Sequence, residues 1–471
     1  MDYVSTRGNA APLGFTEAML AGLAPDGGLY VPTAWPRLDR EAIAGFAGRP
    51  YAEVAVEVMR PFTAGSISDS DLARMAREAY ASFRDPAVAP LIQIGANTFL
   101  LELFHGPTLA FKDVALQLLA RLMDHALAAR GERRTVAVAT SGDTGGAAIE
   151  AFAGKDRVDV VVLFPQGRIS DVQRRMMTTE KSANIHAVAI EGTFDDCQAI
   201  VKGMFNHAAF RDRVNLSGVN SINWARIIAQ AAYYFTAAVE LGAPGRAVAF
   251  TVPTGNFGDI YAGYVAQLLG LPVERLTIAT NVNDILARVL ATGDYELHDV
   301  VATSSPSMDI QVASNFERLL FEAYGRDGGA VRAVMDSLAR TRRFTLSAPA
   351  LSQIRASFTA ARADEEEVAA TIRTVKRETG MFVDPHTAVG IAAAEKGLRD
   401  PAVPMVVLST AHPAKFPDAV AAACGERPKL PDWLSDLNQR PERLTVLPAD
   451  QSAVERFVLT TSRAAQEGAA A

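Results

Sequence analysis

Lys112 follows a run of apolar residues in the segment LELFHGPTLAFKD, residues 101–113. The pattern predicts a buried strand that leads into a Gly-Pro turn, with Leu109, Ala110 and Phe111 directly before the lysine. Removal from water disfavours an ammonium ion, so a lysine in such surroundings has a lowered pKa, and its neutral amine can form a Schiff base or act as a base. The alternative is a lysine in the first turn of a helix whose amine reaches solvent.

A second segment, ATSGDTGGAAIEAF at 139–152, follows a predicted strand and opens a predicted helix. Ser141, Asp143 and Thr144 offer side-chain oxygens next to main-chain N–H groups at the start of that helix, a place that attracts a carboxylate or a phosphate. The sequence fits neither GxxxxGK[ST] nor GxGxxG. The alternative is an ordinary helix cap formed by Asp143 or Thr144.

A third segment, TVPTGNFGDIYAGY at 251–264, again has a strand, a glycine-rich turn and a helix in succession. Gly255 and Gly258 allow the main chain to approach an anion closely, and the amides of residues 255–259 can converge on it. A tight turn between strand and helix is the alternative here. Two such loops together with an embedded lysine are harder to explain as ordinary turns than either loop alone.

Two polar loops, SMDIQVASNFER at 307–318 and VLSTAHPAKFPD at 407–418, carry further candidates. Ser409 and Thr410 lie at the end of a predicted buried strand. A hydroxyl there can bond a pyridine nitrogen and leave it largely unprotonated, whereas a carboxylate would hold a proton on it. The alternative is a cap for a helix at 413–424. The seven histidines include no HExxH pattern and no pair at i, i+4, so we expect no metal site.

Short apolar runs alternate with segments of helical period from about residue 96 onward. Such near-continuous apolar strands are typical of parallel sheets that are covered on both faces. The predicted class is therefore α/β, with two open twisted parallel-type sheets flanked by helices and with ligands at the carboxyl ends of the strands. Strands are expected at 98–104, 135–139, 158–164, 185–190, 247–252, 275–280 and 404–409, and helices at 113–129, 145–153, 195–208, 223–241, 259–269, 365–378 and 386–397.

Residues 1–95 differ from the rest, with helical periods near 17–22, 40–48 and 70–84, and are expected to form an extra, mainly helical N-terminal domain. A polar helical stretch at 350–380 and the proline-rich segment after 425 are interpreted as peripheral additions. The remainder is predicted to divide into a larger α/β domain, 96–134 with 245–430, a smaller α/β domain, 135–244, and a C-terminal tail, 431–471.

The composition is that of a globular protein with more than one core: 471 residues, of which 49% are hydrophobic and 21% charged. A formal net charge of −7 argues against a protein that coats nucleic acid, which needs clustered Lys and Arg. The two cysteines, Cys197 and Cys424, have no paired spacing, and no signal peptide or membrane-spanning run is found. We therefore expect a cytoplasmic protein without nucleic-acid or membrane partners.

Nine segments in order resemble threonine synthase of the longer bacterial and fungal type, a member of the tryptophan-synthase-like group (fold type II) of pyridoxal-5′-phosphate (PLP) enzymes. They span roughly residues 4–417 and are VSTRG, HGPTLAFKD, TSGDTGGAA, FPQGRIS, VNSINWARI, PTGNFGDIYAG, SMDIQVASNFER, DPHTAVG and STAHPAKFP.

This resemblance implies a role for individual residues. Lys112 matches the lysine that forms the Schiff base with PLP, and Asp143 matches the position near the 3′-oxygen of the cofactor. Thr410 matches the hydroxyl residue that faces the pyridine nitrogen. The loop that cradles the cofactor phosphate in this family is matched by Gly255, Asn256, Phe257, Gly258 and Asp259. The substrate carboxylate is expected at Ser141 and Thr144, and the candidates for the substrate phosphate are Asn223, Arg226, Ser314, Asn315 and Arg318.

The reaction that the resemblance implies is conversion of O-phospho-L-homoserine and water into L-threonine and phosphate, by loss of phosphate from Cγ and addition of water at Cβ. The same resemblance favours a monomer. Three alternatives stay open: a dehydratase or β-replacement synthase of the same fold, a phospho-lyase that releases an oxo-acid, and a binding protein without catalysis. The identity of the products separates the first two, and the absence of bound cofactor would favour the third.

Overall fold

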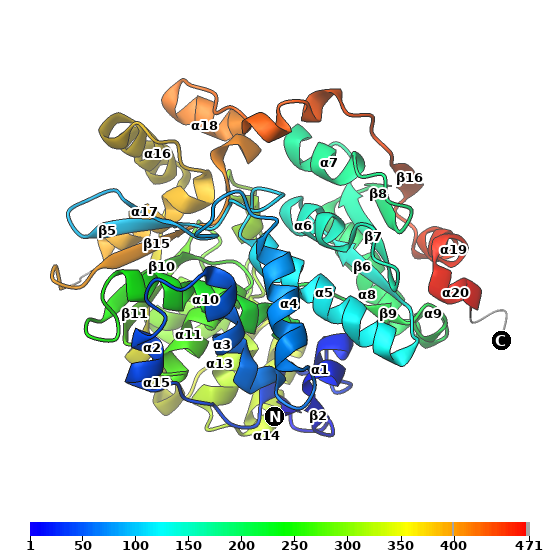
Figure 1. Ribbon diagram of the computed structural model, residues 1–471, viewed down its shortest axis with the longest axis horizontal. Helices are drawn as coiled ribbons and strands as arrows, with labels where there is room; N and C mark the ends of the chain where they lie inside the picture. Colours follow the sequence, from blue (N-terminus) through cyan, green and yellow to red (C-terminus); the bar gives the residue numbers. More distant parts are fainter. Residues whose placement is uncertain (398–399, 468–471) are drawn as a thin grey trace.

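Two sheets form the framework of the protein in the computed structural model, which describes residues 1–397 and 400–467 (Figure 1). The larger sheet has the strand order β14-β11-β10-β15-β5-β4, and its strands are parallel except for β4, which runs antiparallel to β5. The bounds are β4 Leu91–Gln93, β5 Thr98–Glu102, β10 Val248–Pro253, β11 Val273–Thr280, β14 Phe358–Arg362 and β15 Met405–Ser409.

The smaller sheet has the order β16-β8-β7-β6-β9, and all of its neighbours are parallel. Every residue of β7, VDVVVLFP, is buried, as expected for a central strand that is covered on both faces. The bounds are β6 Arg134–Ala139, β7 Val158–Pro165, β8 Ile185–Glu191, β9 Leu216–Ser217 and β16 Thr445–Pro448. The predicted class, with two parallel-type sheets, is confirmed.

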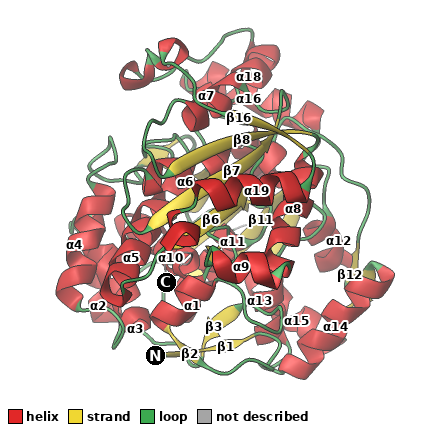
Figure 2. Ribbon diagram, turned by 90° about the vertical axis from the view of Figure 1, so that its right-hand side faces the viewer, coloured by secondary structure: helices red, strands yellow, loops and turns green. Residues whose placement is uncertain are grey.

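Helices cover both sheets on two sides. In Figure 2, α8, α9 and α19 lie in front of the smaller sheet, while α5 and α6 pack together and contact its other side. The larger sheet lies between α17 on one face and α10 with α11 on the other. The bounds of these helices are α5 Lys112–Arg130, α6 Asp143–Phe152, α8 Phe194–Asn206, α9 Ala208–Arg213, α10 Trp224–Glu240, α11 Gly258–Leu268, α17 Pro385–Lys396 and α19 Gln451–Thr461.

The remaining helices and a small hairpin lie outside the two main sheets. The helices are α7 Asp171–Thr178, α12 Ile285–Thr292, α13 Phe316–Ala323, α14 Gly328–Thr341, α15 Ala348–Ser357, α16 Glu365–Thr379, α18 Pro417–Cys424 and α20 Arg463–Glu467. The short 3₁₀ turns are η1 Pro306–Met308, η2 Pro413–Lys415, η3 Asp432–Leu434 and η4 Leu437–Gln439, and a small hairpin pairs β12 Asp294–Glu296 with β13 Arg343–Thr345.

The N-terminal region holds four helices, as predicted in kind, and also a small antiparallel sheet that the sequence analysis missed. The sheet has the order β2-β1-β3, and α10 shares a hydrophobic core with this region. Helix α3 was not predicted, because its sequence YAEVAVEVMRPFT alternates like a strand and contains a proline. The bounds are β1 Asp2–Ser5, β2 Leu13–Gly14, β3 Tyr30–Pro32, α1 Phe15–Ala21, α2 Arg40–Ala44, α3 Tyr51–Thr63 and α4 Asp69–Tyr80.

Two segments interpreted as peripheral are built into the sheets instead. Residues 358–362 form β14, the edge strand beside β11, and residues 445–448 form β16, the edge strand beside β8. Both are short edge strands that pair on one side, so their apolar patterns are weak. The division of the chain into domains otherwise stays a prediction. No helix in the described ranges is both long and apolar enough to cross a membrane.

Candidate active site

The amine of Lys112 is buried at the junction of the two sheets. Lys112 is the first residue of α5, is 8% exposed, and places Nζ 3.4 Å from Oδ2 of Asp143, the first residue of α6. Burial lowers the pKa of Lys112. The alternative of an amine that extends into solvent therefore does not describe this structure, and a neutral, nucleophilic amine is favoured.

The turn before Lys112 is fixed by a buried carboxylate. Asp113 accepts hydrogen bonds from the hydroxyl and the main-chain N–H of Thr108, at 2.6 and 2.7 Å. Burial raises the pKa of Asp113 to about 6, against these bonds. The N–H of Phe111 donates to the carbonyl of Thr410 at 2.9 Å. The bond from Phe111 holds the start of α5 against the end of β15. The bonds of Asp113 to Thr108 fix the turn and give the aspartate after Lys112 a structural role.

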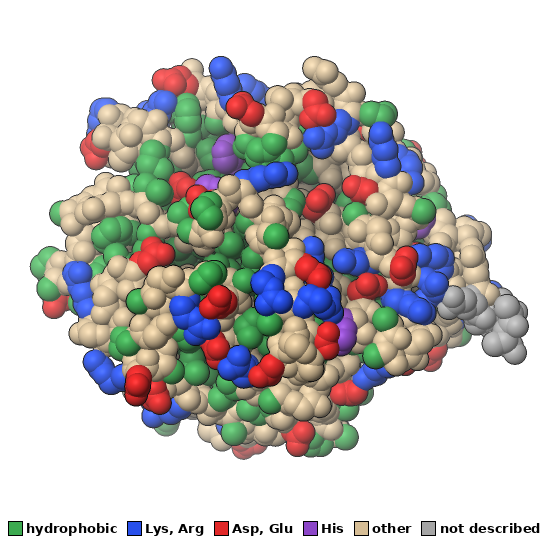
Figure 3. Space-filling view, in the orientation of Figure 1, with side chains coloured by type: hydrophobic (Ala, Val, Ile, Leu, Met, Phe, Trp, Pro, Cys, Tyr) green, Lys and Arg blue, Asp and Glu red, His purple; other side chains and the backbone are tan. Residues whose placement is uncertain are grey.

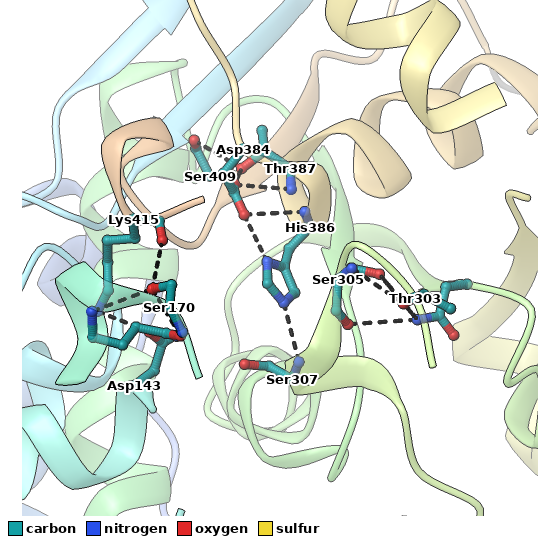
Figure 4. A network of polar contacts seen from close by, with 12 residues as sticks. Asp143, Ser170, Thr303, Ser305, Ser307, Asp384, His386, Thr387, Ser409 and Lys415 are labelled. Atoms are coloured by element: carbon teal, nitrogen blue, oxygen red, sulfur yellow. Dashed lines mark hydrogen bonds and ion pairs between the residues drawn. The ribbon is translucent and has the colours of Figure 1, made fainter. Parts of the chain in front are cut away.

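Asp143 does not cap α6, as the ordinary interpretation of its loop would require. That part belongs to Thr140, which the sequence analysis missed: its hydroxyl accepts from the N–H groups of Gly142 and Gly145 at 2.9 and 3.0 Å. The carboxylate of Asp143 is 4% exposed and points toward the amines of Lys112 and Lys415 (Figure 4 shows the latter). Ser141 and Thr144 are partly exposed on either side of it, which leaves them accessible to a ligand.

The glycine-rich loop after β10 is held in shape by its neighbours. Phe257 has a left-handed backbone, with φ of 64°, and comes directly before α11. Both the N–H and the side-chain amide of Asn315 donate to the carbonyl of Asn256 at 3.0 Å. A Cβ on Gly255 would lie 2.5 Å from the carbonyl oxygen of Ser307. The close approach of these two chain segments requires glycine at this position.

The side chains of this loop point mainly into the protein. The ring of Phe257 packs against Phe316 and Phe358, with centroids 5.4 and 5.7 Å apart. Asp259 accepts bonds from the hydroxyls of Tyr233 and Tyr234, and burial raises its pKa to about 6. The groups of this loop that remain available to an anion are the main-chain amides at the start of α11 and the exposed side chain of Asn256.

The hydroxyls of Ser409 and Thr410 differ in their partners. Oγ of Ser409 contacts Oγ1 of Thr387 at 3.1 Å, whereas Oγ1 of Thr410 has no hydrogen-bond partner among the described residues. Thr410 is 5% exposed. Of the two, Thr410 has the hydroxyl available to a ligand.

Of the five candidates for a substrate phosphate, three already use their polar groups within the protein. Asn223 caps α10 and donates to the carbonyl of Met19 at 2.8 Å. Arg318 donates to the carbonyls of Tyr30 and Ile222 and to the side chain of Asn315. The bonds of the third, Asn315, go to this arginine and to the glycine-rich loop.

The other two candidates lie in different places. Ser314 lines a cavity of about 270 Å³, together with Arg7 and Glu317. Arg226 is 3% exposed, donates to the carbonyl of Val219 at 3.1 Å, and has an Nε without a partner. Burial lowers its pKa to about 10, and no carboxylate in the described part of the chain pairs with it. A buried cation with an unused donor is suited to an anionic ligand.

Sequence reasoning also missed a polar network around the site, drawn in Figure 4. It includes Lys415, whose amine lies 2.8 Å from Oδ1 of Asp143, and His386, whose Nδ1 lies 2.6 Å from Asp384. The motifs DPHTAVG and STAHPAKFP contain these residues, so the resemblance marked the segments without giving them a role. The described residues include no group of three or more His, Cys, Asp or Glu arranged to hold a metal.

Comparison with known proteins assigns the family. Three family models match: "Threonine synthase N terminus" at residues 2–80, "Pyridoxal-phosphate dependent enzyme" at 86–410 and "Threonine synthase, C-terminal" at 387–458. The chain is 53% identical to threonine synthase of Pseudomonas aeruginosa over 97% of this chain and 98% of the relative. The chain belongs to the threonine synthase family.

Solved threonine synthases also have the same fold. The PLP-bound enzyme from Brucella melitensis is 60% identical, with a TM-score of 0.96 over 98% of this chain and all of that one. The yeast enzyme is 39% identical, with a TM-score of 0.93 over 98% of both chains. Threonine deaminase isoform 2 from Solanum lycopersicum, at 13% identity and a TM-score of 0.51, has only the fold in common.

The residues of this threonine synthase family member fit PLP. A buried lysine with a lowered pKa is available for the aldehyde, and the amides at the start of α11 are available for the phosphate. The hydroxyl of Thr410 has no hydrogen-bond partner in the described part of the chain, so it is available to a ligand. The chain is a PLP-dependent enzyme, and the fit of these groups agrees with that assignment.

Proposed function

We propose that this enzyme converts O-phospho-L-homoserine and water into L-threonine and phosphate. The main support comes from two buried cations. Lys112 lies beside Asp143, and Arg226 has a donor without a partner in the described part of the chain. The lysine suits chemistry at Cα, and the arginine suits a substrate with a phosphate at its far end. Threonine synthases that resemble the chain over nearly its whole length support the same reaction.

PLP, when bound, supplies the electron sink for negative charge that develops at Cα and Cβ of the substrate. We propose that Lys112 anchors PLP, then takes the proton from Cα and moves protons at Cβ and Cγ. Its burial keeps the amine neutral enough for this role. The helix α6 starts beside Lys112, so Ser141 and Thr144 with the amides of that helix would hold the substrate carboxylate.

The other proposed contacts hold the cofactor. The amides of residues 255–259 at the start of α11 would bind its phosphate. Phe257 and Asp259 would contribute main chain only, because their side chains are bound within the protein, whereas the side chain of Asn256 is exposed. Asp143 would lie near the 3′-oxygen. Thr410 would bond the pyridine nitrogen and leave it unprotonated, which moderates the sink and favours elimination over transamination.

The substrate phosphate is assigned here to Arg226. The positive charge of Arg226 helps to lower the pKa of Lys112, so the two cations repel each other. A phosphate dianion would relieve that repulsion and the cost of burying the arginine. Asn223, Asn315 and Arg318 would then support this site through the backbone, because their own side chains are bound within the protein.

Product identification tests the proposed function. The purified enzyme with PLP should release equal amounts of threonine and phosphate from phosphohomoserine, while Lys112→Ala should release neither. An oxo-acid and phosphate in place of threonine would indicate a phospho-lyase, and turnover of serine or threonine to an oxo-acid would indicate a dehydratase.

We further propose a cytoplasmic monomer without nucleic-acid or membrane partners. The net charge is −7, and Figure 3 shows Lys and Arg interspersed with Asp and Glu over the visible face. A phosphate backbone is bound by clustered cations, so this face does not suit nucleic acid. The two cysteines are free, in keeping with a reducing compartment. Sedimentation of the purified enzyme tests the monomer.

A further inference from the structure

A second lysine is buried beside the one proposed to carry the cofactor. Lys415 ends the short turn η2 and is 1% exposed. Its amine lies 2.8 Å from Oδ1 of Asp143 and donates to the carbonyl of Thr108 at 2.8 Å (Figure 4). Lysine is seldom buried this completely, and its amine here has two oxygen partners. The proposed mechanism has no use for this residue so far.

Two lysines therefore share one carboxylate, and they share it unequally. Lys112 lies 3.4 Å from Oδ2 of Asp143, whereas Lys415 lies 2.8 Å from Oδ1. Gln173 also donates to Oδ1, at 2.9 Å. The shorter contact is the stronger one, and a single carboxylate fully neutralises only one of two ammonium ions. Lys415 is the better partner of Asp143.

Lys415 is also held in place independently of Asp143. Its main-chain carbonyl accepts a hydrogen bond of 3.1 Å from the hydroxyl of Ser170, which caps α7. The residue thus contacts the unit of the smaller sheet through both its side chain and its main chain. The bond from Ser170 fixes the backbone of Lys415, and the contacts with Asp143 and Thr108 fix its amine.

Several other charges face Lys112. Asp143 on α6 attracts its ammonium form, while Lys415 on η2 and Arg226 on α10 repel it. Asp259 on α11 also acts on Lys112, although burial raises the pKa of that carboxyl to about 6. Asp113, beside Lys112 on α5, has its pKa raised to about 6 by burial and is affected by Lys415. Against the effect of burial, the ammonium ion of Lys415, joined by that of Lys112 when this amine is protonated, holds the pKa of Asp143 well below its usual range.

We propose that Lys415 is a positioning residue of the active site: its ammonium is the fixed counter-charge of Asp143, and this leaves the amine of Lys112 uncharged and free to react with PLP. The proposal rests on the proposed attachment of PLP at Lys112. In that step the amine lone pair forms a C–N bond to the aldehyde carbon, and the two amine hydrogens leave with the carbonyl oxygen as water. An ammonium ion has no lone pair for this reaction.

The test measures bond formation between apoenzyme and PLP, followed by the visible absorbance of the bound cofactor over a range of pH. Lys415→Met and Lys415→Gln remove the charge, and Gln keeps polar contacts with Asp143. In both, the midpoint of the pH–rate profile should rise by about one pH unit, which slows the reaction about tenfold below the midpoint. Lys415→Arg keeps the charge and should stay close to wild type.

Controls separate this effect from loss of fold. The exposed Lys202, changed to Met, should leave the profile unchanged. Adding Asp143→Asn to Lys415→Met removes both charges and should return the midpoint toward wild type. Thermal unfolding of each apoenzyme shows whether a variant is folded at the temperature of the assay.

An unchanged midpoint in folded Lys415→Gln would overturn the proposal. A raised KM for phosphohomoserine with an unchanged midpoint would also overturn it, and would make Lys415 a ligand of the substrate. The measurement needs no substrate, so failure of the enzyme to make threonine would affect the proposed function and not this result. Absence of any covalent bond at Lys112 in the wild-type enzyme would refute the attachment on which both depend.

Discussion

The main-chain N–H of Ser307 donates a hydrogen bond of 3.2 Å to Nε2 of His386, a residue 79 positions later in the chain. Nδ1 of the same ring lies 2.6 Å from Oδ2 of Asp384, so Nδ1 carries the proton and Nε2 is the acceptor. The carbonyl of Ser307 in turn lies against Gly255 of the glycine-rich loop. His386 thus holds the segment that packs against the proposed phosphate cradle.

Replacing His386 with Ala should therefore weaken cofactor binding from a distance. The change leaves the N–H of Ser307 without its partner, which costs about 1–3 kcal/mol for a buried group. It also removes the ring contact of Asp384, which keeps its bonds from the main chain and from Thr387. We expect lower stability in urea and a raised dissociation constant for PLP, measured by titration of absorbance. His298→Ala, at an exposed histidine, is the control. Equal PLP affinity in His386→Ala and wild type would show that Ser307 does not support the cradle.

The two glycines of the cradle should respond differently to the same substitution. A Cβ on Gly255 would lie 2.5 Å from a main-chain oxygen, while a Cβ on Gly258 meets its nearest atoms, on Asn315 and Ser221, at 3.4 Å. Gly255→Ala should destabilise the apoenzyme itself. Gly258→Ala should leave the apoenzyme within about 1 kcal/mol of wild type but weaken PLP binding, because a methyl group is added where an anion approaches.

Urea unfolding of both apoenzymes and PLP titration of both variants check this pair. If Gly258→Ala binds PLP as tightly as wild type, residues 255–259 form an ordinary turn and not a phosphate cradle. If Gly255→Ala is as stable as wild type, the loop at 305–309 is able to move away from residue 255.

Arg226 and Arg318 are both buried, but only one is predicted to act on substrate. Arg226→Gln removes a buried charge that lacks a counter-charge, so stability should hold or increase. Its kcat/KM for phosphohomoserine should fall by about 10- to 100-fold, as expected for one charged hydrogen bond to a phosphate. Arg318→Gln should instead destabilise the fold by about 3 kcal/mol, because two carbonyls and Asn315 lose their donor.

Steady-state kinetics and urea unfolding of both variants separate the two roles. A normal kcat/KM in Arg226→Gln would assign the substrate phosphate elsewhere. Competition by inorganic phosphate gives a second readout, since phosphate should inhibit wild type more strongly than Arg226→Gln.

His412 should make stability sensitive to acid. Burial lowers its pKa to about 4 in the folded protein, from 6.5 for a free histidine. The unfolded chain therefore binds the extra proton between these values, and the stabilising contribution is complete above pH 6.5 and is lost as pH falls toward 4. At pH 5 the loss is roughly 2 kcal/mol for this residue.

Replacement of His412 with Asn tests that sign. The asparagine oxygen can accept the bond that Nδ1 now accepts from Ala414 N–H. Between neutral pH and pH 5, wild type should lose about 2 kcal/mol more stability than this variant, measured by urea unfolding at each pH. A variant with the same pH dependence as wild type would mean that His412 protonates without cost.

The central strands and the site motifs could be predicted from the sequence, but the edge strands could not. Strands such as β7 are continuous apolar runs whose period reveals them, and the lysine and glycine motifs lie directly after such strands. The edge strands β14 and β16 have no such pattern, because they pair on one side only. The sequence therefore predicts neither segment as part of a sheet, although β14 pairs with β11 and β16 pairs with β8.

Contacts between residues that are distant in the sequence could not be predicted from local patterns. Lys415 and Asp143 are 272 positions apart, and nothing local in AHPAKFP distinguishes a buried ammonium from a solvated one. Polarity likewise nominated Asn223 and Arg318 for the substrate, while the fold uses both for main-chain contacts. Only the packing shows which polar groups remain free for a ligand.

Directly after β15, the hydroxyl of Thr410 has no hydrogen-bond partner among residues 1–397 and 400–467, whereas the hydroxyl of Ser409 contacts that of Thr387. Thr410→Asp should place a carboxylate near the pyridine nitrogen and favour its protonated form, because a nearby opposite charge shifts a pKa by roughly one to a few units. The ring becomes a stronger electron sink. We expect slower threonine formation and a larger share of oxo-acid or pyridoxamine phosphate, identified by chromatography. Thr410→Ser, which keeps the hydroxyl, is the control. Wild-type rates and products in a Thr410→Asp variant that binds PLP would show that Thr410 does not face the nitrogen, and since Ser409 is already hydrogen-bonded, the ring nitrogen would then lack a hydroxyl partner on this strand.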